Sequence, residues 1–214
     1  MFGIHDLGLF IVSGLLLNLV PGPDTLLVVS RSAAQGWRAG SAAALGIGAG
    51  TFVHVLAAAL GLSALLAASA AAFEIVKYIG AAYLVYVGAR MLLAQRAAEP
   101  APETAPRPAV APPLRTVFAQ GFLTNVLNPK VALFFLAFVP QFIDAQAPAK
   151  ALAFIFLGCV FNFNSMLWSH ALVYFAAAAG RRVRVGPRML LWMNRTIGAL
   201  FVGFGLRLAL SARG

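Results

Sequence analysis

The sequence predicts an all-α integral membrane protein with six transmembrane helices, arranged as two inverted three-helix repeats in which helices 1 and 4 are interrupted. Three observations support this prediction. Of the 214 residues, 61% are hydrophobic and only 10% are charged, against about 25% charged in ordinary soluble domains. Charge-free runs at 39–73 and 151–180 exceed the roughly 20 residues that cross a ~30 Å hydrocarbon core. Prolines interrupt two other apolar runs at positions that repeat between the halves of the chain.

Six apolar segments are expected to form the helices, at residues 7–30, 39–68, 75–93, 116–143, 150–179 and 190–210. His5 and Asp6 precede the first segment, where a cleaved signal peptide would carry a basic region. We therefore expect this segment to stay in the protein as a helix. Arg90 and Arg207 lie within the third and sixth segments, so their long side chains are expected to reach toward the membrane surface.

A change of composition separates the two halves. The stretch "EPAPETAPRPAVAPP" at residues 99–113 holds half of the protein's twelve prolines, and such a stretch neither propagates a helix nor packs a core. We expect a first three-helix repeat at 1–94, a proline-rich cytoplasmic linker at 95–115 and a second three-helix repeat at 116–214.

The distribution of basic residues predicts the orientation. Eleven of the 16 Lys and Arg residues lie in or beside the loops after the first, third and fifth segments, and four lie on the other side. Basic loops stay in the cytoplasm, so we expect both termini to be periplasmic. The net charge of +10 then reflects membrane topology, and no nucleic-acid partner is expected.

The sequence repeats itself around the proline breaks. "GLLLNLVPGP" at residues 14–23 matches "GFLTNVLNPK" at 121–130, with Asn18 aligned on Asn125. An odd number of spans in each half gives the two halves opposite topology. Interrupted helices at matching positions of inverted repeats point to the substrate site of a secondary transporter, near the middle of the membrane.

The first break is built by Pro21, Gly22 and Pro23. The two prolines each remove a backbone donor, and the glycine permits a sharp change of direction. Broken backbone at membrane depth is tolerated only where protein buries it or where it lines a wet cavity. Asp24 follows the break, at the positive end of the helix that restarts there.

The second break is built by Asn128 and Pro129, and Lys130 follows it. A charge at the bilayer centre costs at least several kcal/mol unless it is solvated or paired. We therefore expect Asp24 and Lys130 to approach each other or to share one aqueous cavity. The alternative is that the prolines are simple kinks and each charge lies nearer a membrane surface.

Other polar residues in the spans could have either a structural or a functional role. Asn18 and Asn125 lie about one turn before the breaks, where they could bind freed backbone groups or a substrate. His54 could take up a proton near neutral pH or pack as a neutral side chain. Polarity along the fifth segment suggests a wet face there, from Asn162, Asn164, Ser165 and His170. The single cysteine, Cys159, is expected to be a buried small hydrophobe, without a disulfide or a metal site.

Two stretches resemble signatures of the LysE/RhtB family of bacterial amino-acid exporters. They are "PGPDTLLVVSRSAAQGWRAG" from residue 21 and "GFLTNVLNPKVALFFLAFVPQFID" from residue 121. The third and sixth segments also fit, so the resemblance covers nearly the whole chain apart from the linker. It implies a secondary exporter of amino acids or their derivatives in the bacterial inner membrane, with no catalytic residues and no cofactor. Energy is expected from an ion gradient, with protons as the coupling ion, and no GxxxxGK[ST] motif for ATP is present.

The resemblance also implies where the site lies and what it takes. The functional centre would be the motifs Pro21 to Asp24 and Asn128 to Lys130. Exporters of basic amino acids in this family can carry an acidic residue in the second span, where this chain has only His54. Neutral substrates such as threonine, homoserine or homoserine lactone are therefore favoured. The expected partners are this substrate, the coupling ion and the lipid bilayer, and a homodimer is compatible with the sequence.

Two alternatives stay open at this point. One is a transporter of another small solute or a metal ion in the same superfamily. A dithiol carrier needs a cysteine pair, and a metal exporter needs more soft or carboxylate ligands along its path. The other is an intramembrane enzyme that uses Asp24 and His54 for acid–base chemistry, although no nucleophile–base motif accompanies them.

Overall fold

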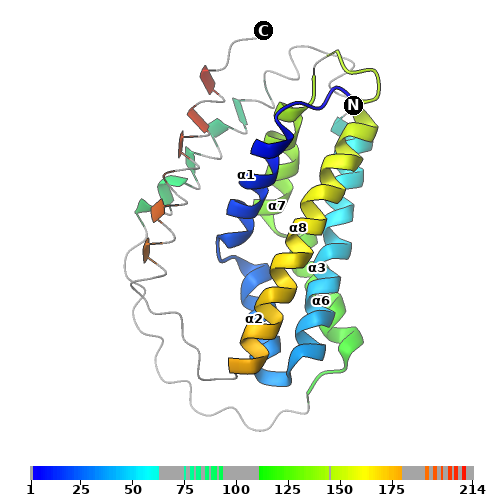
Figure 1. The fold of residues 1–214 in the computed structure, drawn as a ribbon, viewed down its shortest axis with the longest axis vertical. Helices are drawn as coiled ribbons and strands as arrows, with labels where there is room; N and C mark the ends of the chain where they lie inside the picture. Colours follow the sequence, from blue (N-terminus) through cyan, green and yellow to red (C-terminus); the bar gives the residue numbers. More distant parts are fainter. Residues whose placement is uncertain are drawn as a thin grey trace.

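A computed structural model describes residues 2–62, 111–144 and 146–179, with scattered positions between 75 and 93 and between 191 and 210. In the described parts the regular elements are helices, apart from one isolated β-bridge between Ile4 and Ile143. The helices labelled in Figure 1 run roughly along one common axis. Residues 95–110 of the expected linker lie outside the described residues, as do parts of the third and sixth expected helices.

The first span is broken as expected. Helix α1 (Leu7–Leu19) and helix α2 (Pro23–Gln35) meet at an angle of 58°. Gly22 caps α2 in an extended conformation, and Pro23 fills the first helical position, where no N–H is needed. The expected end at Ser30 is wrong, because α2 continues to Gln35. Arg31 is tied into the bundle by a 2.8 Å bond from its Nη2 to Gln120 Oε1, so a charge at this position does not end the helix.

The second and fifth segments form long helices. Helix α3 (Trp37–Ala57) continues into one turn of π-helix, η1 (Ala58–Leu62). Residues 63–68 of the second expected segment lie outside the described residues. Helix α8 (Lys150–Ala179) has the expected bounds. Within the described residues, two helices are long and apolar enough to cross a membrane, and there are up to four spans if each bent pair counts as one.

The fourth segment is broken at the expected asparagine and proline. Helix α6 (Leu114–Val126) is followed by α7 (Pro129–Leu133), the π-helix η2 (Phe134–Phe138) and the 3-10 helix η3 (Val139–Phe142), with a bend of 48° at the break. The fourth span begins two residues before the expected start at residue 116. Pro113 caps α6 and accepts bonds from Thr116 N and Val117 N, so residues 114 and 115 form the first turn.

Glycines let α3 and α6 pack backbone against backbone. A β-carbon at Gly46 would overlap the carbonyl oxygen of Phe118, and one at Gly121 would overlap that of Ala43. A β-carbon at Gly50 would lie 2.8 Å from the carbonyl oxygen of Phe122. Small residues allow such close contact between membrane helices, where packing replaces the hydrophobic effect as the driving force. This contact fixes the second span against the start of the fourth.

Gly46→Ala is expected to destabilise the protein, because the added methyl group must push α6 away from α3. Overpacking of this kind costs about 1–3 kcal/mol. Thermal unfolding of the purified protein in detergent should show a lower Tm for this variant. The matched control is Gly8→Ala in α1, where a β-carbon would meet no atom within 4 Å. Equal Tm values for the two variants would contradict the close α3–α6 contact.

Two apolar clusters pack the interior on either side of the break in the first span. The aromatic cluster packs against α1, and its rings include Phe134 and Phe161, with centroids 4.6 Å apart. Its members are Phe10, Phe134, Phe135, Phe138, Phe142 and Phe161. The aliphatic cluster packs against α2 and consists of Val28, Ala43, Ala44, Ile47, Val117 and Val173. The residues between these clusters are polar and form the candidate site.

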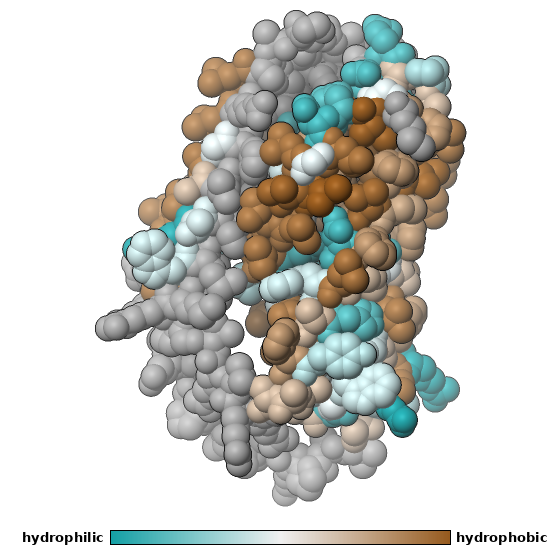
Figure 2. Space-filling view, viewed as in Figure 1, coloured by the Kyte–Doolittle hydropathy of each residue, from teal (hydrophilic) through white to brown (hydrophobic). Residues whose placement is uncertain are grey.

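The outer surface is strongly apolar. Large apolar side chains are exposed along every described span, among them Leu26, Leu60, Leu127 and Phe175. Apolar residues cover much of the visible face, and hydrophilic ones gather near its ends (Figure 2). The expectation that Cys159 is buried is wrong, because its side chain is exposed. A membrane helix such as α8 is apolar all round, so hydropathy cannot separate its inner face from its lipid-facing one.

Candidate functional site

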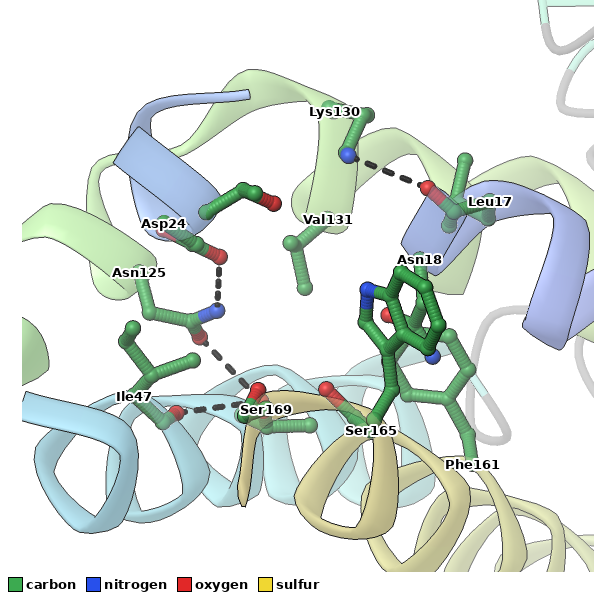
Figure 3. A pocket seen from close by; sticks show the side chains of 13 residues that line it. Leu17, Asn18, Asp24, Ile47, Asn125, Lys130, Val131, Phe161, Ser165 and Ser169 are labelled. Carbon is green, nitrogen blue, oxygen red and sulfur yellow. Dashed lines mark hydrogen bonds between the residues drawn. The ribbon is translucent and has the colours of Figure 1, made fainter. Parts of the chain in front are cut away.

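A small cavity lies where the two broken spans meet α3 and α8. Its volume is about 30 Å³, enough for about two water molecules. Figure 3 shows side chains from both breaks facing it. The lining residues are Leu17, Asn18, Asp24, Thr25, Ile47, Thr51, Asn125, Lys130, Val131, Phe161, Ser165, Trp168 and Ser169. The structure thus brings Asn18, Asp24, Asn125 and Lys130 to one place, although more than 100 residues separate the two motifs.

Asp24 is held on one side only. Its Oδ2 accepts a bond of 2.8 Å from Asn125 Nδ2, and Asn125 Oδ1 accepts from Thr51 Oγ1 at 3.3 Å. Thr51 Oγ1 also lies 3.1 Å from Ile47 O, on its own helix. The chain of contacts from α2 through α6 to α3 is visible in Figure 3. Asp24 Oδ1 is buried without a hydrogen-bond partner in the described part of the chain, so this oxygen is free to bind a cation.

Lys130 occupies the break in the first span. Its Nζ donates to Leu17 O at 3.2 Å and to Val20 O at 3.1 Å. In an unbroken helix, Leu17 O would accept from residue 21, but Pro21 has no N–H. Leu17 O also accepts from Val20 N at 3.2 Å, so the ammonium is a second donor to Leu17 O and gives Val20 O a donor at the break. Gly22 leaves room for it, since a β-carbon there would lie 3.3 Å from Nζ.

His54 occupies the equivalent place at the second break. Its Nε2 lies 3.0 Å from Asn125 O, and a carbonyl oxygen only accepts, so the proton of this bond is on Nε2. Residue 129 is Pro129 and has no N–H to give to Asn125 O; this carbonyl accepts from Asn128 N at 2.9 Å instead, and His54 is a second donor to it. The ring also stacks on Phe135, with centroids 6.3 Å apart and planes 9° apart. His54 is not among the residues that line the cavity.

Each break is therefore completed by the other half of the chain. Lys130 follows the second break and caps carbonyls at the first, whereas His54 lies in α3 and caps a carbonyl at the second. Asp24 and Lys130 line the same cavity but, within the described residues, form no direct ion pair. Asp24 binds the side-chain amide of Asn125, and Lys130 binds backbone carbonyl oxygens of α1 and the residue after it.

Asn128 caps α7 and does not line the cavity. Its Oδ1 accepts from Lys130 N at 3.0 Å, and its side chain is 2% exposed. This bond starts the short helix that carries Lys130. Its role in this structure is to position Lys130.

Three buried polar atoms at the cavity lack hydrogen-bond partners in the described part of the chain. They are the acceptor Asp24 Oδ1 and two donors, Asn18 Nδ2 and Trp168 Nε1. Buried polar atoms are nearly always paired, and an unpaired one calls for an explanation. The rest of the lining is mixed: Leu17, Ile47, Val131 and Phe161 give it an apolar surface, and the other residues are polar. The cavity thus offers both donor and acceptor groups beside an apolar surface.

Part of the α8 face that lines the cavity was not predicted from the sequence. Of the four polar residues singled out there, only Ser165 lines the cavity, and Trp168 and Ser169 line it as well. His170 Nδ1 lies 2.9 Å from Met166 O on its own helix. The available signal was spacing, because residues 165, 168 and 169 share one face of a helix. Thr51 follows from the same reasoning, one turn after Ile47 on α3.

No three His, Cys, Asp or Glu side chains in the described ranges come close enough to hold a metal ion. The acidic and imidazole groups of the two breaks are spread over α2 and α3 and bind protein groups instead.

Comparison with known proteins agrees with the resemblance of the two motifs. The LysE type translocator family matches residues 15–212. A leucine efflux protein of Salmonella choleraesuis strain SC-B67 is 31% identical over 208 residues, which is 97% of this chain and 96% of that one. One of Enterobacter sp. strain 638 is also 31% identical over 208 residues, 97% of each chain. An uncharacterised membrane protein of Pseudomonas aeruginosa is 34% identical over 207 residues, 97% of this chain and 96% of that one. No solved structure matches.

The family match spans most of the chain, and the relatives align nearly end to end. The helical spans, the broken helices and the exposed apolar surface fit a membrane transporter, and the family is one of transporters and not of enzymes. The chain is a multi-pass helical membrane protein that belongs to the LysE type translocator family of amino-acid efflux transporters.

Proposed function

We propose that this protein exports neutral amino acids with apolar side chains, such as leucine, across the bacterial inner membrane, driven by the proton gradient. One observation supports this most: a cavity between two broken spans holds one acid and one base beside an apolar surface. Relatives in Salmonella and Enterobacter carry the name leucine efflux protein. The positive-inside pattern supports periplasmic termini.

The lining of the cavity favours a neutral amino acid. The zwitterion has one ammonium and one carboxylate, and the cavity has one acidic side chain, Asp24, and one basic side chain, Lys130. A lysine or arginine substrate would need a second acid for its side chain, and no other Asp or Glu lines the cavity. Leu17, Ile47, Val131 and Phe161 offer a surface for an aliphatic side chain, and the relatives named as leucine efflux proteins favour leucine over threonine or homoserine.

Alternating access explains how such a small cavity can serve a transporter. Small-molecule sites are typically about 300–1,000 Å³, so the site must widen to admit an amino acid. Phe161 of the aromatic cluster and Ile47 of the aliphatic cluster both line the cavity. In our proposal, residues 1–94 and 116–214 rock as two inverted repeats and open these clusters in turn.

Asp24 is the group that couples export to the proton gradient in this proposal. Its free oxygen, Oδ1, can hold either the substrate ammonium or a proton, but not both. On the cytoplasmic side the carboxylate binds the substrate, and on the more acidic periplasmic side a proton displaces it. The protonated site then returns and releases the proton into the cytoplasm. One amino acid leaves for each proton that enters, which is antiport.

Counterflow in proteoliposomes tests the proposal. We expect exchange of labelled leucine to be faster than that of threonine or homoserine, with no exchange of lysine. An inward-directed proton gradient should accelerate net export, and collapse of the gradient by an ionophore should remove the acceleration. Absence of exchange for every amino acid would overturn the proposed function. Exchange without any response to the gradient would overturn only the proton coupling.

A further inference from the structure

We infer that Trp168 on α8 binds the substrate carboxylate through its indole N–H, together with the side-chain amide of Asn18 on α1. This inference rests on the proposed function, because it names the groups that recognise an amino acid in the same cavity. In this arrangement the substrate carboxylate binds to α8 and α1, and the substrate ammonium binds to Asp24 of α2.

The argument begins with the chemistry of the unpaired atoms. An indole N–H is a donor and never an acceptor, so the only ligand group that can satisfy it is an acceptor. Trp168 Nε1 is buried at the cavity without a hydrogen-bond partner in the described residues. Asn18 Nδ2 is also a donor that is buried at the cavity without a hydrogen-bond partner in the described residues. A carboxylate supplies two acceptor oxygens and no donor, which matches two unpaired donors.

Lys130 adds positive charge but is not available as the main carboxylate ligand. Two of the three N–H groups of its ammonium donate to the carbonyls of Leu17 and Val20. A substrate carboxylate that took over these hydrogens would leave the broken end of α1 without its cap. Neutral donors that are bound to nothing else, such as the indole of Trp168, can instead bind the carboxylate without disturbing the break.

The acceptor side of the cavity completes the match. Asp24 Oδ1 is the one unpaired acceptor among the buried atoms that line the cavity in the described residues. An ammonium group has donors only, so it can bind there and cannot bind at Trp168. The orientation of the substrate follows from this pairing. A ligand that lacks one charged end should lose only the contacts made to that end.

Competition against leucine binding tests the inference with two ligands and three variants. The probes are leucine and 3-methylbutylamine, its decarboxylated amine, which keeps the ammonium and the side chain but has no acceptor oxygen. The variants are Trp168→Phe, which keeps the aromatic ring and removes the N–H, Asn18→Leu, which removes the amide, and Trp37→Phe as control. Trp37 is 50% exposed at the start of α3 and does not line the cavity. Affinity is read as the ligand-dependent rise of Tm in detergent and as competition in counterflow.

We expect Trp168→Phe to weaken leucine binding about tenfold or more, as for a hydrogen bond to a charged group. Binding of 3-methylbutylamine should change less than about twofold, because this amine has no acceptor for the indole N–H, and Trp37→Phe should change neither. Equal weakening of both ligands would show that Trp168 only shapes the cavity, and it would overturn the inference. If Trp168→Phe does not fold, the ratio of the two affinities in Asn18→Leu decides in the same way.

The wild-type protein separates this inference from the proposed function. If it binds leucine but does not exchange it, the export proposal fails, and the affinity ratio still decides the carboxylate site. If the wild-type protein exchanges leucine, and the ratio of the affinities for the two ligands is the same in Trp168→Phe and Asn18→Leu as in the wild type, only the proposed carboxylate site is overturned. If it neither binds nor exchanges leucine, both are overturned.

Discussion

Asp24→Asn abolishes proton-driven export in our expectation, with the rate of gradient-driven leucine efflux reduced at least about a hundredfold. The substitution removes the charge that would hold the substrate ammonium and the group that would carry the proton. Loss of a charged hydrogen-bonding partner costs about 1.5–3 kcal/mol in binding alone, and loss of proton exchange removes the driving force as well. Efflux from proteoliposomes under an imposed pH gradient measures both.

The fold should survive this change, because asparagine can still accept from Asn125 Nδ2 through its own carbonyl oxygen. The matched control is Asp144→Asn, since the Asp144 side chain is 61% exposed and lies outside the cavity. It should export at the wild-type rate. Gradient-driven export at the wild-type rate by Asp24→Asn would falsify the coupling role of this carboxylate.

Lys130→Met lowers both the stability and the export rate in our expectation. Methionine fills a similar volume but donates nothing, so Val20 O loses the ammonium that caps it, whereas Leu17 O keeps its bond from Val20 N. A buried group left without a hydrogen bond costs about 1–3 kcal/mol. The measurements are Tm in detergent and exchange of labelled leucine. Gly22→Ala should reproduce part of the effect, because its methyl group presses against the ammonium.

Lys150→Met is the matched control for this variant. Lys150 is the first residue of α8 and does not line the cavity. Its substitution should leave Tm and exchange close to the wild-type values. If Lys130→Met kept the wild-type Tm, the capping of α1 by the ammonium would not contribute to stability, and the role of Lys130 would have to be sought in the substrate.

Much of the fold could be predicted from sequence, because lipid imposes simple rules on a chain. The bounds of α8 follow directly from one charge-free run of sufficient length. Both breaks follow from proline, which has no N–H to give. The expected end of the first span is too early because a charge, Arg31, does not end a helix; α2 ends at Gln35 and is capped by Gly36, whose φ of 82° is the left-handed conformation that glycine favours. The π-helical turns of η1 and η2 left no signal in the sequence.

Part of the candidate site could also be predicted from the rules that lipid imposes on a chain. Charges in apolar spans are costly, so Asp24 and Lys130 stood out without any structure. The role of Lys130 as a cap could not be foreseen, because it depends on which carbonyls lie within reach of its ammonium. Trp168 could not be recognised as a site residue from the sequence. A tryptophan in an apolar span looks like ordinary packing until its N–H is found buried and unpaired.

The reciprocal capping of the two breaks has a consequence for biogenesis. As the chain leaves the ribosome, the first broken span is made before Lys130, so Leu17 O and Val20 O then have no ammonium to bind. Leu17 O keeps its bond from Val20 N, but Val20 O lacks this donor, and unpaired carbonyls are costly in hydrocarbon; we therefore expect the break to stay in water or inside the translocon until the fourth span arrives. The second break finds His54 already in place. Insertion is therefore completed from the C-terminal half back to the N-terminal one.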